Sequence, residues 1–92
     1  MRIVSVDVTA QNQFTEWLRI PGMAVMTIAD TGAMNMTTTL QCRVSSTATS
    51  IDSDTQTLAG AYPLSCGGNL EWRAGVKIGG YTAGTATITL SY

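Results

Sequence analysis

Apolar and polar residues alternate strictly over long stretches of this chain, and this period of two is the feature that most constrains its fold. In residues 34–45 the even positions are mostly apolar and the odd positions are polar. Residues 3–10, 70–78 and 85–92 alternate in the same way. Because successive side chains of a β-strand point to opposite faces, this pattern predicts strands with one buried face.

The remaining segments give weaker strand and turn signals. Residues 23–29 are apolar on both faces, which suits a central strand covered on both sides, or on one side by a partner. Residues 14–20 are interpreted as a further strand, although Phe14, Trp17 and Leu18 also fit helical spacing, and residues 55–59 are interpreted as a short strand. The sequence Asp-Thr-Gly at 30–32 predicts a hairpin loop, and the Ser/Thr/Asp-rich residues 45–54 predict a mobile loop.

Several strands of this kind, separated by turns every ~8–12 residues, are typical of an antiparallel sandwich. A chain of 92 residues suffices for one hydrophobic core and is short for two. The sequence therefore predicts a single all-β domain over residues 1–92. Its expected architecture is an antiparallel β-sandwich or a jelly-roll-like small barrel of about six to eight strands.

The low charge content narrows the classes of function. Charged residues make up 12% of the chain, about half the ~25% of an average soluble domain, while 15 Thr and 7 Ser supply polar surface. Five Lys and Arg residues are too few for a nucleic-acid partner. With no His and a single Lys, the chain lacks the usual partners of a catalytic nucleophile and the usual metal ligands. We therefore expect a protein that is not an enzyme and has no cofactor or metal.

Targeting signals and cysteines bear on the compartment. Asp7 interrupts the N-terminal apolar run too early for a secretory signal, and no stretch approaches the ~18 apolar residues of a membrane helix. We expect no membrane partner and a protein made in the cytosol or assembled there. Cys42 and Cys66 are interpreted as two thiols or as a disulfide, and the sequence leaves this choice open.

Three side chains are candidates for a contact surface. Trp17 lies on the more polar face of its segment, which favours an interface anchor as much as a core position. Met23 and Met26 belong to a methionine cluster, which predicts adaptable core filling or contact with a neighbouring subunit. Trp72 shares the inward face of its strand and is expected in the core. We single out Trp17, Met23 and Met26 as the possible interface, and no catalytic residue.

The C-terminal half resembles a group of known proteins. Residues 72–91, WRAGVKIGGYTAGTATITLS, resemble the closing stretch of small tailed-bacteriophage β-sandwich virion proteins, and residues 39–44, TLQCRV, resemble an earlier strand of theirs. These two segments contain 26 of the chain's 92 residues. Residues 45–49 depart from the glycine-rich turn that often follows this strand in the family.

The resemblance implies a virion structural protein, first of all a capsid decoration (cement) protein. Such a protein assembles in the host cytoplasm, forms a dimer or trimer and sits on the capsid surface, where its partner is the major capsid protein. It has no small-molecule substrate. A head–tail or tail/fibre component is an alternative within virions. A carbohydrate-binding sandwich is the alternative from another class, and it predicts Trp17, Tyr62 or Tyr81 exposed along a shallow groove.

Overall fold

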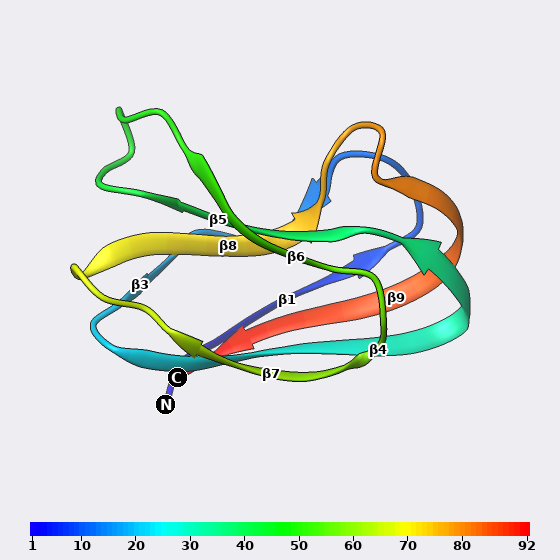
Figure 1. Ribbon diagram of the computed structural model, residues 1–92, viewed down its shortest axis with the longest axis horizontal. Coiled ribbons are helices and arrows are strands. Elements are labelled where there is room, and N and C mark those ends of the chain that lie inside the picture. The colour runs from blue at the N-terminus through cyan, green and yellow to red at the C-terminus, as the bar shows by residue number, and fades with distance from the viewer.

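The computed structural model describes residues 1–92 as nine β-strands without a helix (Figure 1). The strands are β1 (Ile3–Val8), β2 (Gln13–Phe14), β3 (Leu18–Ile20), β4 (Met23–Met36), β5 (Thr38–Arg43), β6 (Ile51–Gln56), β7 (Gly60–Ser65), β8 (Leu70–Val76) and β9 (Tyr81–Ser91). All of them pair antiparallel, in two sheets that pack face to face. The predicted fold class, an all-β antiparallel sandwich, is confirmed.

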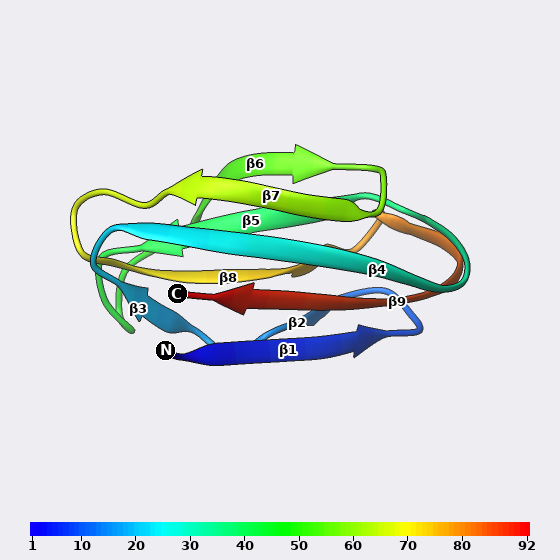
Figure 2. The same ribbon diagram turned by 90° about the horizontal axis from the view of Figure 1, so that it is seen from below.

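The two sheets have different strand orders. Sheet A has the order β1-β9-β4-β7. Sheet B has the order β2-β8-β5-β6, and β3 also pairs with β8. Figure 2 shows β6 and β7 along one side of the sandwich and β1, β2 and β3 along the opposite side. The chain therefore presents two broad outer faces and two narrow sides.

The core lies between the sheets and contains seventeen buried apolar residues. Alternate residues of each long strand supply it, as the period of two predicts. Trp72 is only 6% exposed and belongs to this core, which confirms its predicted position. The largest fully buried side chains are Leu18, Ile20, Met26, Ile28, Ile88 and Leu90.

The hairpin predicted at residues 30–32 is absent, because β4 continues through this segment as a fourteen-residue strand. The register between β4 and β9 shifts repeatedly from Asp30 to Met36, so the extra residues are absorbed as bulges. The Asp30 carboxylate accepts hydrogen bonds from the backbone N–H groups of Gly32 and Met34, and these bonds stabilise the bulged segment of β4.

Residues 34–45, predicted as one strand, belong to both sheets. The chain leaves sheet A after Met36 and enters sheet B at Thr38. Met36, Thr38 and Leu40 are all buried because both strands face the same core. The apolar alternation of the sequence therefore continues across the crossover and conceals it. In β5, however, Thr39 and Gln41 on the opposite face are also buried, so this strand is covered on both faces and not on one as predicted.

Residues 45–65 also differ from the prediction. Strand β6 begins at Ile51, inside the predicted mobile loop of residues 45–54. It ends at Gln56, so the short strand predicted at residues 55–59 only overlaps its end, and a further strand, β7, begins at Gly60. None of the β6 residues is buried, so this strand has no apolar period to reveal it. Residues 14–20 form two short strands instead of one. These differences bring the total to nine strands.

The two chain ends lie side by side. The backbone N–H of Arg2 donates to the carbonyl of Tyr92 over 2.7 Å, and the N–H of Tyr92 donates back to the carbonyl of Arg2 over 3.0 Å. Figure 2 shows the N and C ends together at one end of the sandwich. The chain has no helix long and apolar enough to span a membrane.

Candidate contact surfaces

The outer face of sheet A is almost free of charge. The even-numbered residues of β4 from Ala24 to Ile28 are buried, so its odd-numbered residues point outward. The strand register extends this face across all four strands. Its residues are Ile3, Ser5, Asp7, Met23, Val25, Thr27, Ala29, Ala61, Pro63, Ser65, Thr87, Thr89 and Ser91. Asp7, on the edge strand β1, is the single charged member.

Three large apolar side chains are exposed close together on this face. Ile3 is 56% exposed, Met23 68% and Val25 37%. Ser91 pairs with both Ile3 and Val25, so these two side chains flank it in one row across the sheet. Met23 lies two residues from Val25 on the same strand. An exposed apolar group on a charge-poor surface is typical of a protein contact.

The outer face of sheet B has the opposite character, because four of the five cationic side chains lie there. Two of them stack on Trp17: the guanidinium carbon of Arg43 lies 4.0 Å from the ring centroid, and that of Arg73 lies 4.7 Å from it. The Arg73 guanidinium also lies 4.0 Å from the ring centroid of Phe14. The four cationic residues are Arg19, Arg43, Arg73 and Lys77.

Two acidic side chains form ion pairs with three of these cations. Glu71 accepts a hydrogen bond from Arg43 Nε over 2.8 Å, and its other oxygen lies 3.6 Å from Arg19 Nη2. Lys77 Nζ donates to Asp52 over 2.6 Å. The pKa of Asp52 lies below its ordinary value, because Lys77 and then Gln41 donate hydrogen bonds to this carboxylate.

Arg73 is the exception, since no carboxylate pairs with it. Its Nε donates to the side-chain oxygen of Gln41 over 2.8 Å. Burial, and secondarily the neighbouring charge of Arg43, lower the pKa of Arg73 from its ordinary value. The guanidinium nevertheless remains charged at physiological pH.

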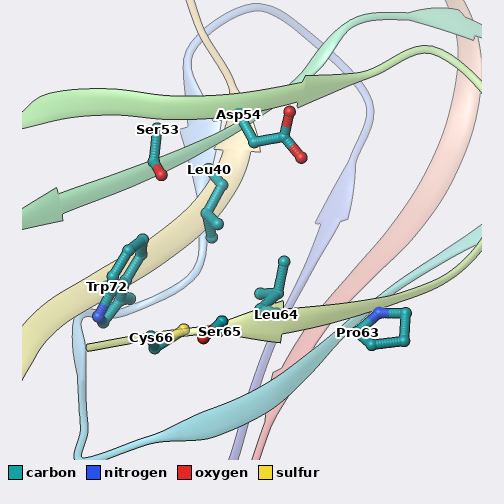
Figure 3. A pocket seen from close by; sticks show the side chains of 8 residues that line it. All are labelled: Leu40, Ser53, Asp54, Pro63, Leu64, Ser65, Cys66 and Trp72. Atoms are coloured by element: carbon teal, nitrogen blue, oxygen red, sulfur yellow. The ribbon is translucent and has the colours of Figure 1, made fainter.

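A cavity of about 280 Å³ opens on the side of the sandwich between β6 and β7 (Figure 3). Its lining residues are Leu40, Ser53, Asp54, Pro63, Leu64, Ser65, Cys66 and Trp72. The indole Nε1 of Trp72 is buried without a hydrogen-bond partner. The titratable side chains in the lining are the Asp54 carboxyl and the Cys66 thiol.

The two cysteines are buried, free thiols in this structure. Burial raises the pKa of both thiols, and the proximity of Cys42 raises the pKa of Cys66 further. A raised pKa keeps a thiol protonated and weakly nucleophilic. No group of three or more Cys, Asp or Glu side chains is placed to hold a metal ion.

The structure does not bring the three predicted contact residues together. Trp17 lies over the outer face of sheet B, and Met23 lies on the outer face of sheet A. Met26 is fully buried between the sheets, which contradicts its place in the predicted contact surface. As an inward residue of β4 it alternates with Met23 and Val25, so the same strand puts one methionine in the core and another outside.

Sequence reasoning missed the two arginines that stack on Trp17. Alternation correctly placed Arg43 and Arg73 on outward faces of their strands. Their convergence depends on the pairing of β5 with β8, where Gln41 is opposite Arg73. No signal within either strand specifies that register.

Comparison with known proteins gives a family and no function. No curated protein and no solved structure matches the chain. A family model described as a domain of unknown function, DUF4402, matches residues 4–92. This match spans nearly the whole sandwich, and the chain therefore belongs to the DUF4402 family.

Proposed function

We propose that this domain is a non-enzymatic structural module that binds neighbouring protein subunits through the outer face of sheet A. The observation that supports this proposal best is the group of exposed apolar side chains, Ile3, Met23 and Val25, on a broad face whose single charge is Asp7. Interface cores are depleted in charge, and burial of apolar area contributes roughly 25 cal/mol per Å².

The side formed by β6 and β7 is less suited to contact by strand addition. Pro63 lies in the edge strand β7 and has no N–H to donate to an added strand. The edge strand β6 is bulged near Ser53 and carries two aspartates. Bulges, prolines and charges are the usual features that prevent edge pairing. These features favour contact through a sheet face over contact through this edge.

More specifically, we propose that this domain is a bacteriophage capsid decoration protein. It would form a dimer or trimer at the capsid surface and bind the major capsid protein. The likeness of residues 72–91 to virion proteins supports this form. A small sandwich with one charge-poor face suits it, because repetition over many copies multiplies a modest contact energy. A head–tail or tail/fibre position uses the same contact chemistry and differs in copy number.

The carbohydrate-binding alternative has less support. Arginines already stack on Trp17, which occupies the ring surface that a sugar would need. The hydroxyl groups of Tyr62 and Tyr81 donate to the backbone carbonyls of Leu58 and Gly84, and both side chains are half-buried. The three aromatic residues lie on separate segments, with no common groove among them.

Sedimentation equilibrium of the purified domain tests the contact face. We expect the wild type to form a dimer or trimer and Val25→Lys to weaken its association at least tenfold, about 1.4 kcal/mol, because a lysine would enter an apolar contact. The matched control is Ile78→Lys, since Ile78 is 79% exposed and lies outside this face. Equal weakening by both variants, or a monomeric wild type at high concentration, would refute the proposed face.

Electron microscopy of virions that contain the domain tests the specific form. We expect density for hundreds of copies distributed over the shell. A few copies at one vertex would instead indicate the head–tail or tail component. Absence from the particle would refute the virion role and leave the contact face to be judged by sedimentation alone.

A further inference from the structure

We propose that Arg73 is the centre of a carboxylate-binding site on the outer face of sheet B, and that its ligand is an acidic side chain of a partner protein. This site is separate from the face of sheet A in the proposed function, and it adds a second contact of different chemistry.

The guanidinium of Arg73 is held by three neighbours. The rings of Phe14 and Trp17 pack against it at 4.0 and 4.7 Å from its central carbon. Gln41 accepts the hydrogen bond from Nε over 2.8 Å. Gln41 is itself only 7% exposed, and its amide nitrogen donates to Asp52 over 2.9 Å, which orients its oxygen toward Arg73. The side chain is therefore positioned before any ligand arrives.

No carboxylate lies within ion-pair distance of Arg73. Glu71 is already bonded to Arg43 and lies near Arg19, and Asp52 is bonded to Lys77. Arg43 stacks on the same indole ring as Arg73, so two positive charges lie close together. A bound anion would relieve this repulsion, which lowers the pKa of Arg73 after the larger effect of burial.

The two Nη atoms remain for the ligand, because Nε is occupied and the rings pack against the guanidinium. This planar fork matches the two oxygens of a carboxylate in a bidentate arrangement. The half-buried ring of Phe14 also offers apolar contact to the methylene groups next to such a carboxylate. A glutamate or aspartate on a partner chain supplies both features, whereas a free small anion supplies only the first.

A nuclear magnetic resonance titration of the ¹⁵N-labelled domain tests the site. The chain has two tryptophans, so the indole signal of Trp17 reports on the site while that of Trp72 reports on the core. The probes are a capped peptide with a single glutamate, the same peptide with glutamine, and acetate, all at constant ionic strength. We expect the glutamate peptide to shift the Trp17 and Arg73 Nε–H signals saturably and to leave Trp72 unchanged.

Substitutions of Arg73 distinguish bidentate recognition by the two Nη atoms from attraction by the positive charge alone. We expect Arg73→Gln to weaken peptide binding at least tenfold and Arg73→Lys to weaken it severalfold, because lysine keeps the charge and loses the fork. Arg2→Gln is the matched control, since Arg2 is exposed and lies outside this face, and it should bind as the wild type does. An unchanged Trp72 signal verifies that each variant is folded.

Three results would overturn the proposal. Equal binding of the glutamate and glutamine peptides would show that the carboxylate is not recognised. Acetate binding as tightly as the glutamate peptide would show that the partner chain adds nothing. Undiminished binding by Arg73→Gln would place the site elsewhere.

Discussion

Two buried threonines differ in whether their hydroxyl group has a hydrogen-bond partner. Thr15 is 4% exposed, and its hydroxyl donates to the carbonyl of Glu16 and accepts from the N–H of Ala74. Thr38 is completely buried, and its hydroxyl has no partner. Burial of a hydroxyl group costs free energy unless a hydrogen bond compensates for the loss of water.

The substitution to valine should therefore separate these two sites. We expect Thr15→Val to lower the free energy of unfolding by about 1–2 kcal/mol, because the Ala74 N–H loses an acceptor. Thr38→Val should leave it unchanged or raise it by up to about 1 kcal/mol, since no hydrogen bond is lost. Urea unfolding measures both values. A larger loss at Thr38 than at Thr15 would contradict this assignment.

At the scale of the element, strand β2 depends on a glycine in its neighbour. Phe14 pairs with Gly75 of β8. A Cβ atom at Gly75 would lie 2.2 Å from the carbonyl oxygen of Gln13 and 2.5 Å from the Cα of Phe14. Only a residue without a side chain lets β2 approach β8 this closely.

Gly75→Ala should consequently displace β2. We expect a loss of about 1–3 kcal/mol in the free energy of unfolding, as is usual for overpacking. Gly67→Ala is the matched control, because a Cβ there meets nothing within 4 Å, and its effect should stay within about 0.5 kcal/mol. Thermal or urea denaturation compares the two, and equal stabilities would rule out the close approach as the cause.

The strands also show what the sequence can and cannot predict. Strands β1, β8 and β9 were predicted well because each buries one face and alternates accordingly. Strand β6 was largely missed, since it forms through backbone pairing with β5 and buries nothing. The bulges of β4 were mistaken for a hairpin loop, because Asp, Thr and Gly favour both structures.

For the whole molecule, the candidate surfaces were only partly predictable. Residues 23–29 are apolar on both faces, and only one face of strand β4 packs on the core. Exposure of Met23 on the other face of this central strand therefore follows from the sequence of the segment itself. The stack of Trp17, Arg43 and Arg73 requires three segments to meet, and its geometry depends on registers that no single segment determines. Long-range pairing, more than local propensity, was the missing information.

The cysteines provide a probe of the folded sandwich as a unit. Cys42 lies in sheet B and Cys66 directly follows β7 of sheet A, and both are buried. Their thiol pKa values are raised by burial, so less of the reactive thiolate is present at a given pH. We expect slow reaction with Ellman's reagent at pH ~8 in the native state and fast reaction in guanidinium chloride. Rapid labelling of the native protein would contradict the burial of these thiols.

The raised thiol pKa values also determine how the free energy of unfolding changes with pH. The folded protein retains its thiol protons at pH values where the unfolded chain has released them. The free energy of unfolding should therefore be highest below the ordinary thiol pKa of about 8.5 and fall as the pH rises above it. Replacement of both cysteines by serine should remove this part of the pH dependence in denaturation curves.

The reciprocal hydrogen bonds between Arg2 and Tyr92 have a practical consequence for protein engineering. A short glycine-rich linker would join these neighbouring ends without disturbing either sheet, so that new ends can be opened in the exposed loop before β6. A fluorophore or affinity tag attached there would project from a different region than one fused to Met1 or Tyr92. Rearranged chains of this kind would allow either broad face to be displayed on a support while the other is left accessible.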